Sequence, residues 1–138
     1  MKGTFNFSYS GLKTAVINYI HKQKQNNIEV NIADVCHSFQ CEAVGELVTK
    51  TLAAAKKYRI KTVAVAGGVA ANGYLRKTLT EEGEKQGVKV LFPPMVLCTD
   101  NAAMIGAEAY FNLISGEGLA DMTLSACSGL NLKYSVKK

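Results

Sequence analysis

VAGGVAAN, at residues 65–72, is an apolar run that passes through two glycines to an asparagine where a helix is expected to begin. CTDNAAMI, at residues 98–105, has the same form, because an apolar run precedes it and short polar residues open a second helix. In open α/β sheets, ligands bind at strand ends where such turns meet. The two stretches therefore predict part of a nucleotide and metal site at one edge of a sheet.

The sequence around these stretches predicts a parallel βαβ unit. Residues 61–66 are typical of a buried strand, because the run is short and contains β-branched side chains. Residues 88–92 predict a second strand, which two prolines end because proline cannot donate to a ladder. A helix over residues 72–83 separates the strands, which favours parallel neighbours. Two strands make an incomplete sheet, so we expect either further short strands or a chain cut from something larger.

The rest of the chain is predicted to be mostly helical. Residues 5–9 alternate aromatic and polar side chains and predict an extended segment, followed by a helix over 12–21 and a polar loop over 22–27. A last helix is predicted over 100–113, and the tail behind it has little periodicity. The first of these helices is expected to turn four apolar side chains inward: Leu12, Val16, Tyr19 and Ile20.

The strongest helical period begins behind Asn31, which is a good N-cap residue, and continues to about Tyr58. Gly45 lies within it at a cost of about 1 kcal/mol in helix propensity, which predicts a close helix–helix contact there. The apolar stripe comprises Ile32, Val35, Phe39, Ala43 and Leu47, widened by Val44, Val48, Leu52 and Ala55.

Length and composition are those of one soluble globular domain. The chain has 138 residues, of which 48% are hydrophobic and 20% charged, unlike a disordered chain. The net charge of +5 fits an acidic partner such as RNA, although many basic proteins bind no nucleic acid. The four cysteines form no C-x-x-C pair, no secretory leader is visible, and the apolar run over 62–71 is too short to span a bilayer. We expect a cytoplasmic protein with reduced thiols and no membrane contact.

Four residues in the two opening stretches are candidate ligand contacts. Gly67 and Gly68 allow the backbone to approach a ligand, and the helix behind them offers N–H groups to an anion; an ordinary strand-to-helix turn is the alternative. Asn72 and Asp100 each stand where a helix N-cap belongs. The functional alternative for Asp100 is a carboxylate ligand of a metal ion, which needs about three protein ligands in all.

Other reactive side chains are interpreted as structural. His21 and His37 lack the spacing of a paired helical metal site. Cys98 is interpreted as a small buried residue rather than a ligand. No His/Asp partner is apparent for three residues near the N-terminus, to which capping and surface roles are assigned: Ser8, Ser10 and Lys13.

Three segments, in this order and spacing, resemble the C-terminal part of one family. They are FNFSYSGLKTAV at 5–16, VAGGVAAN at 65–72 and CTDNAAMI at 98–105. Together they are similar to the tRNA N6-adenosine threonylcarbamoyltransferase family, formerly called O-sialoglycoprotein endopeptidases or glycoproteases, over nearly the whole chain. The resemblance implies an α/β fold that is part of an actin-like ATPase (ribonuclease H-like) lobe. Residues 1–138 would then be a single domain from the second lobe of a larger two-lobe enzyme.

The resemblance also implies a reaction. The family transfers a threonylcarbamoyl group from threonylcarbamoyl-AMP to N6 of adenosine 37 in tRNAs that read codons beginning with A. It works beside an iron or zinc ion and with accessory proteins that supply the adenylate. By motif position, Asn72 resembles the adenylate contact and Asp100 the third metal ligand. Gly67 and Gly68 resemble the turn that lines the nucleotide.

Two features of the family are missing from this sequence. The H-x-x-x-H motif that supplies its metal-binding histidines is absent, and so are the phosphate loops of its first lobe. The resemblance therefore implies a fragment, with Met1 as an added start, that is inactive alone and does not retain the metal. A tRNA substrate agrees with the positive charge. The candidate contacts, for which a solvated helix face is the alternative, are Lys56, Lys57, Arg59, Arg76 and Lys77.

Two other functions stay open at this point. One is another ATP-using enzyme of the same fold, such as a sugar or acetate kinase, which activity on a panel of sugars would reveal. The other is a non-catalytic interaction module, for which an exposed sheet edge or apolar face would favour a homodimer. The old protease label finds no support, because the sequence has neither H-E-x-x-H nor a defensible Ser/His/Asp arrangement.

Overall fold

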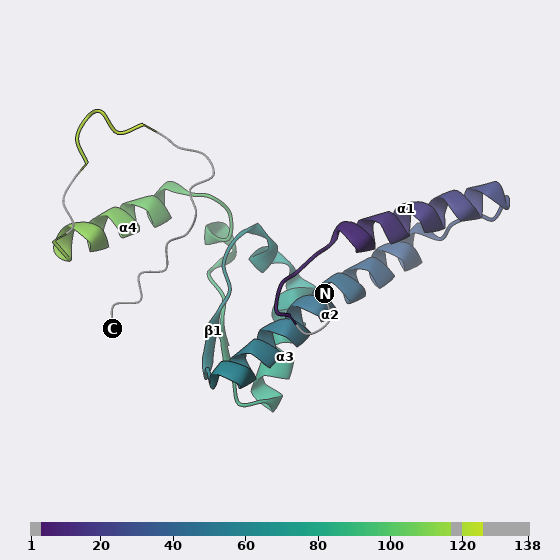
Figure 1. Ribbon diagram of the computed structural model, residues 1–138, viewed down its shortest axis with the longest axis horizontal. Coiled ribbons are helices and arrows are strands. Elements are labelled where there is room, and N and C mark those ends of the chain that lie inside the picture. Colours follow the sequence, from purple (N-terminus) through teal and green to yellow (C-terminus); the bar gives the residue numbers. More distant parts are fainter. Residues whose placement is uncertain (1–3, 117–119, 126–138) are drawn as a thin grey trace. The chain divides into compact units, whose positions relative to one another are not determined.

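A computed structural model describes residues 4–116 and 120–125 of the chain (Figure 1). The chain forms two compact units, residues 1–100 and residues 101–138. The second unit contains α4 (Ala102–Ile114). The first contains, in order, α1 (Ser10–Gln25), α2 (Ile32–Tyr58), β1 (Thr62–Ala64), η1 (Gly68–Ala71), α3 (Gly73–Lys85), β2 (Lys89–Leu91) and η2 (Met95–Leu97), where η marks a 3-10 helix. The fold is mixed α/β and mostly helical.

The predicted βαβ unit is present in the first unit. β1 and β2 pair in parallel, and α3 connects them. The ladder extends slightly beyond the strands, because Val65 N–H donates to Leu91 O at 2.9 Å and Lys89 N–H donates to Lys61 O at 2.8 Å. Each strand has three residues, fewer than predicted, and the sheet of the described chain has these two strands only.

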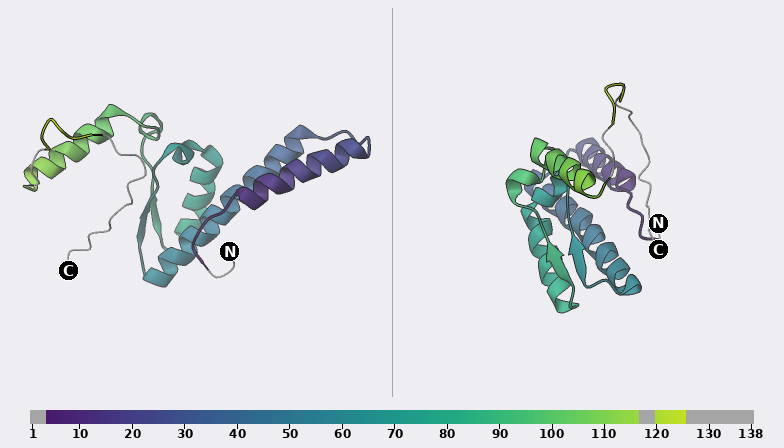
Figure 2. Two further views of the ribbon diagram at one scale, coloured as in Figure 1. Left: turned by 45° about the horizontal axis from the view of Figure 1, so that its top comes forward. Right: turned by 90° about the vertical axis from the view of Figure 1, so that its left-hand side faces the viewer.

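The hydrophobic core lies on one face of this sheet. α2 and α3 pack against each other and against the strands (Figure 2). Alternate strand residues face the helices, as the pleat of a strand requires. The buried members are Val44, Val48, Leu52 and Ala55 of α2, Leu75 and Leu79 of α3, and Val88; Val63, Val65, Val90 and Phe92 of the strand segments pack against them.

The opposite face of the sheet is exposed. Thr62, Ala64 and Leu91 alternate with the core residues, and Leu91 is 44% exposed. The prediction of a buried strand at 61–66 is therefore wrong for this face. Parallel strands are ordinarily covered on both faces and therefore have continuous apolar sequences. Such a sequence does not reveal whether the residues that cover the second face belong to the same segment of chain.

α1 lies beside the first half of α2 (Figure 1). It runs over Ser10–Gln25 rather than 12–21, so most of the predicted loop at 22–27 is helical. Leu12, Val16 and Ile20 are half-buried as predicted, whereas Tyr19 is 47% exposed. A single neighbouring helix covers a narrower stripe than a full core does, which leaves the flank of the apolar face in solvent.

α2 begins and ends where the sequence predicts. Asn31 Oδ1 accepts the N–H groups of Ala33 at 3.1 Å and Asp34 at 3.4 Å, so Asn31 is the N-cap. Residues after position 43 carry the buried stripe, whereas Ile32 and Phe39 are exposed. The first half of α2 packs against α1 and not against the core. The predicted apolar stripe is therefore longer than the part of α2 that the core buries.

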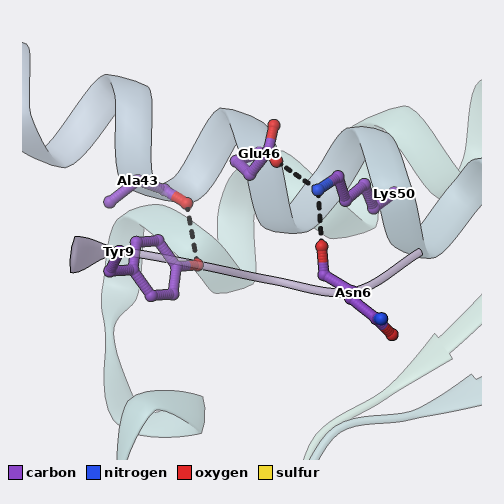
Figure 3. Close-up of polar contacts among 5 residues, drawn as sticks. All are labelled: Asn6, Tyr9, Ala43, Glu46 and Lys50. Atoms are coloured by element: carbon purple, nitrogen blue, oxygen red, sulfur yellow. Dashed lines mark hydrogen bonds and ion pairs between the residues drawn. The ribbon is translucent and has the colours of Figure 1, made fainter. Parts of the chain in front are cut away.

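Residues 5–8 lie along α2 outside any helix or strand, whereas Tyr9, predicted to be extended, has helical backbone angles as the residue before α1. Tyr9 Oη donates to Ala43 O at 3.3 Å (Figure 3). Lys50 Nζ donates to Asn6 O at 2.6 Å and pairs with Glu46 at 2.5 Å. Burial and the Glu46 carboxylate raise the pKa of Tyr9 above its ordinary value.

Close packing requires a glycine at Gly83 rather than at Gly45. A Cβ at Gly83 would lie 2.8 Å from Val90 Cγ2 and 2.9 Å from the carbonyl oxygen of Val88. Nothing lies within 4 Å of a Cβ at Gly45. The predicted close contact at Gly45 is therefore wrong, and the tight approach is between α3 and β2.

α4 begins at Ala102 and ends at Ile114, close to the predicted 100–113. The predicted tail falls largely outside the described residues. Among the helices that the structure describes, none combines the length and apolar character needed to cross a membrane.

Gly83→Ala is expected to lower the free energy of unfolding by about 1–3 kcal/mol, because the added methyl group meets a backbone oxygen that moves only if β2 moves. The matched control is Gly45→Ala, which meets open space and should raise the free energy of unfolding by up to about 1 kcal/mol through helix propensity. Urea titration followed by circular dichroism measures both. Equal stabilities of the two variants would contradict the assigned packing.

Candidate functional site

The candidate site lies where the chain leaves β1 and β2, at the carboxyl edge of the parallel pair. After β1, the chain turns at Gly67 and forms η1 before α3 begins. After β2, Pro93 and Pro94 lead into η2 and then to Cys98 and Asp100. The first motif stretch and residues 98–100 of the second therefore follow neighbouring strands at one edge of the sheet.

Arg76, near the start of α3, joins the two loops. Its Nε donates to Ala70 O and its Nη2 to Pro93 O, both at 2.6 Å. Nη2 also lies 3.1 Å from Cys98 Sγ, and the guanidinium carbon lies 4.9 Å from the centre of the Phe92 ring. Charge-assisted bonds of this kind are stronger than neutral ones, so Arg76 fixes the spacing of the loops.

The position of Arg76 corrects one sequence prediction. Because its guanidinium is engaged inside the protein, Arg76 is not a free RNA contact. The other predicted RNA contacts are exposed on the surface: Lys56, Lys57, Arg59 and Lys77.

Cys98 is part of the same packed loop. It is 2% exposed, and its thiol donates to Pro94 O at 3.5 Å. The interpretation of Cys98 as a small buried residue is confirmed.

Asn72 is the N-cap of α3. Its Oδ1 accepts the N–H of Leu75 at 2.9 Å, which confirms the capping interpretation. The other end of the side-chain amide carries two further N–H donors. Capping therefore uses the acceptor of Asn72 and leaves its donors for a ligand.

The glycine pair serves two different needs. Gly67 has a φ of 91°, in the region that favours glycine. A Cβ at either Gly67 or Gly68 meets nothing within 4 Å, and the φ of Gly68 is not in the left-handed region. Neither backbone conformation nor packing in the described chain accounts for glycine at position 68. Gly68 begins the 3-10 turn η1, and α3 begins only at Gly73, so the predicted helix N-terminus does not follow the glycine pair directly.

Asp100 is exposed and does not cap the last helix. Asn101 is the N-cap of α4, since its Oδ1 accepts the N–H of Met104 at 3.0 Å. The capping interpretation of Asp100 is therefore wrong. Sequence analysis missed Asn101 because both neighbours are good N-cap residues and the choice depends on the backbone.

Metal binding requires more side chains than this edge supplies. Within the described ranges, no group of three or more His, Cys, Asp or Glu residues could hold a metal ion. A protein metal site needs about three protein ligands, so Asp100 by itself does not fit an iron or zinc ion.

A second polar cluster, which the sequence did not predict, joins α2 to α3. Cys41 Sγ lies 3.5 Å from His37 Nε2 and donates to Tyr74 Oη at 3.6 Å. The side-chain hydrogen bond with Cys41 raises the pKa of Tyr74 above its ordinary value. The i,i+4 spacing of His37 and Cys41 is the only signal in the sequence, because the third member depends on helix packing.

The serines near the N-terminus contact each other rather than the helix end. Ser8 Oγ lies 3.1 Å from Ser10 Oγ, and no side chain caps α1. The predicted capping role is therefore wrong for both serines, whereas both are exposed, as the predicted surface role requires. Lys13 is exposed, as a surface role requires.

The model of one protein family, described as tRNA N6-adenosine threonylcarbamoyltransferase, matches residues 1–107. The chain is 49% identical over 129 residues to the tRNA N6-adenosine threonylcarbamoyltransferase of Clostridium perfringens, a match covering 94% of this chain and 38% of that protein. It is 50% identical over 131 residues to the protein of the same name from Moorella thermoacetica, covering 95% and 38%. For Clostridium botulinum the identity is 52% over 113 residues, covering 82% and 33%. The chain thus spans little more than a third of the length of these curated relatives.

Arg76→Met is expected to release the two loops from each other. Alkylation of Cys98 by iodoacetamide should become at least severalfold faster, and the free energy of unfolding should fall by about 2 kcal/mol through loss of charged hydrogen bonds. Mass spectrometry of the digested protein reports Cys98 separately from the other cysteines. The matched control is Lys77→Met at the exposed neighbouring position, and unchanged alkylation of Cys98 in Arg76→Met would refute the assigned role.

Proposed function

The chain belongs to the tRNA N6-adenosine threonylcarbamoyltransferase family, and on that premise we propose that it is part of the enzyme's second lobe. The whole enzyme would transfer a threonylcarbamoyl group from threonylcarbamoyl-AMP to N6 of adenosine 37 in tRNAs reading codons that begin with A, in the cytoplasm. The observation that carries the proposal is the joined pair of loops behind β1 and β2, because both hold motif stretches of the family and leave one edge of a parallel sheet.

The adenylate is proposed to bind at the first of these loops. Open space beside Gly68 leaves room for a ligand to approach the backbone. Helix capping uses only the Oδ1 atom of Asn72, so the side-chain N–H donors are not needed for the cap. The adenylate offers phosphate and nucleoside oxygen atoms as acceptors, so Gly67 and Gly68 would line the nucleotide and Asn72 would donate to it.

Positioning is the part of catalysis that these residues would supply. The adenosine amine is a weak nucleophile, so holding it and the carbonyl carbon in attacking geometry accounts for much of a rate enhancement. The Arg76 bonds keep the two loops at fixed spacing, which is the condition for such positioning.

Asp100 is proposed to contribute one ligand to the iron or zinc ion of the whole enzyme. Its exposure and its freedom from the capping role support this assignment. The described residues do not complete the site, so no step of the reaction is derived through the ion.

The fold and partners complete the proposal. One covered and one exposed face of a parallel sheet support a piece of an actin-like (ribonuclease H-like) lobe. The exposed face is proposed to contact the rest of the polypeptide in the whole enzyme, or a second copy of the chain when it is alone. tRNA and the accessory proteins of the pathway are the further proposed partners.

Asn72→Ser is expected to abolish binding of AMP without unfolding the protein. Serine keeps an acceptor for the N-cap and removes the amide donors, so the melting temperature should change little, whereas Asn72→Ala also loses the cap at a cost of about 1 kcal/mol. The measurement is the thermal shift of the purified chain with AMP. An equal AMP shift in the native chain and in Asn72→Ser would refute the proposed contact.

The purified 138-residue chain is expected to show no modification of tRNA when supplied with threonylcarbamoyl-AMP and iron or zinc. A single carboxylate ligand is too few for a metal centre, and the first-lobe phosphate loops are absent from the sequence. Mass spectrometry of digested tRNA detects the threonylcarbamoyl adduct. If the purified chain modified tRNA more than a boiled sample does, the proposal that catalysis needs the rest of the enzyme would be wrong.

A further inference from the structure

A concentration of positive charge lies at the edge of the sheet opposite the candidate site, where the strands begin. α2 and α3 both end there, and each carries basic residues in its last turn. Lys61 and Lys89 are neighbours across the start of the ladder, since Lys89 N–H donates to Lys61 O at 2.8 Å. We define the basic end as Lys56, Lys57, Arg59, Lys61, Lys85 and Lys89.

A hollow of about 460 Å³ opens to solvent at the basic end. Three cations line it, namely Lys56, Arg59 and Lys61, together with the amide of Gln86. Its apolar lining comes from Ala55, Ile60 and Val88, and no carboxylate lines it. Carboxylates do occur on α3 nearby, where Glu82 pairs with Lys85 at 2.6 Å and Glu81 also acts on Lys85. The lining of the hollow therefore contains three cations and no carboxylate to neutralise them.

Helix electrostatics explains only part of this cluster. Cations near a helix C-terminus are stabilised by the helix dipole, which accounts for Lys56, Lys57 and Lys85. It does not account for Lys61 and Lys89, which stand at strand starts.

Arg59 occupies a backbone position that costs strain for any side chain. It follows the last turn of α2 with a φ of 56°, and its N–H donates to Lys56 O at 3.2 Å. Glycine is the residue that this left-handed C-terminal position favours. An arginine there costs backbone strain that a glycine would avoid, and it places a cation both at the negative end of the helix dipole and on the surface of the basic end.

One exposed and one half-buried aromatic ring adjoin the basic end. Tyr58 is 62% exposed, and its ring centre lies 6.1 Å from that of Phe5. Lys57 Nζ lies 5.2 Å from the Phe5 ring and 5.5 Å from the Tyr58 ring. Cations interleaved with accessible rings are the composition with which proteins hold phosphates and stack bases.

We propose that the basic end binds the phosphate backbone of the RNA substrate at a distance from the reacting base. The inference rests on the proposed function for its choice of tRNA, and on charge complementarity for the surface. An RNA of this kind carries a phosphate at every nucleotide, so it can contact the opposite end of the sheet while its target base is elsewhere. Phosphate contacts of lysine and arginine position the RNA and are salt-dependent, without reading its sequence.

The test compares two charge-matched double variants of the 138-residue chain. Arg59→Gly with Lys61→Gln removes two cations of the basic end, and glycine suits the backbone at position 59. Lys22→Gln with Lys24→Gln removes two exposed cations from the last turn of α1. Fluorescence anisotropy measures the affinity of each protein for a labelled, unmodified tRNA transcript over a salt series, and thermal melting checks that each variant is folded.

The Arg59/Lys61 variant should bind the transcript roughly tenfold more weakly at about 50 mM salt, with a salt slope reduced by about two. The Lys22/Lys24 variant should stay within twofold of the native chain. Equal losses in both variants, or no binding by the native chain, would overturn the proposal. Preference of the native chain for anionic phosphatidylserine vesicles over the transcript, lost in the Arg59/Lys61 variant, would also overturn it in favour of a membrane surface.

The outcome is separable from that of the proposed function. Neither double variant touches Asn72, so the AMP shift should be unchanged in both. Loss of tRNA affinity with an intact AMP shift supports the basic end alone, whereas an absent AMP shift with normal tRNA binding counts against the nucleotide site alone.

Discussion

The structure of the first unit depends on burying one face of a very small sheet. Two strands of three residues each are too few to be stable alone in water. Their apolar face becomes stable because α2 and α3 supply a continuous layer against it. Because Gly83 has no Cβ, α3 can pack closer to β2 than any larger residue would allow. This one packed layer sets where every strand end lies, and so it positions both the motif loops at one edge and the basic end at the other.

The sequence predicted this layer well because its signals are local. A cap at Asn31, a long apolar period and a glycine pair between two apolar runs each act over a few residues. The errors arise where the answer depends on a neighbour. Tyr19 and Ile32 carry the right periodicity but lie beyond the reach of the core. Gly45 and Gly83 look alike in the sequence, and only the position of β2 distinguishes them.

The candidate site was predictable in outline and not in its internal contacts. Parallel strands place their carboxyl ends at one edge, so the two motif stretches were expected there. The bonds of Arg76 to both loops were not expected, because a basic residue four positions into a helix is usually solvated. The choice between Asp100 and Asn101 as the helix cap was also beyond the sequence, since either side chain can accept the same N–H groups. The family's motifs identify the chain more firmly than its own geometry does.

The placement of the core within a single stretch of chain has a consequence for how the protein forms. All the buried residues of the α2–sheet–α3 layer, and the strand residues packed on them, lie between positions 44 and 92. The layer can therefore assemble during synthesis as soon as this stretch has emerged from the ribosome. The order of synthesis thus makes this layer a ready surface on which the residues that follow it in the chain can be organised.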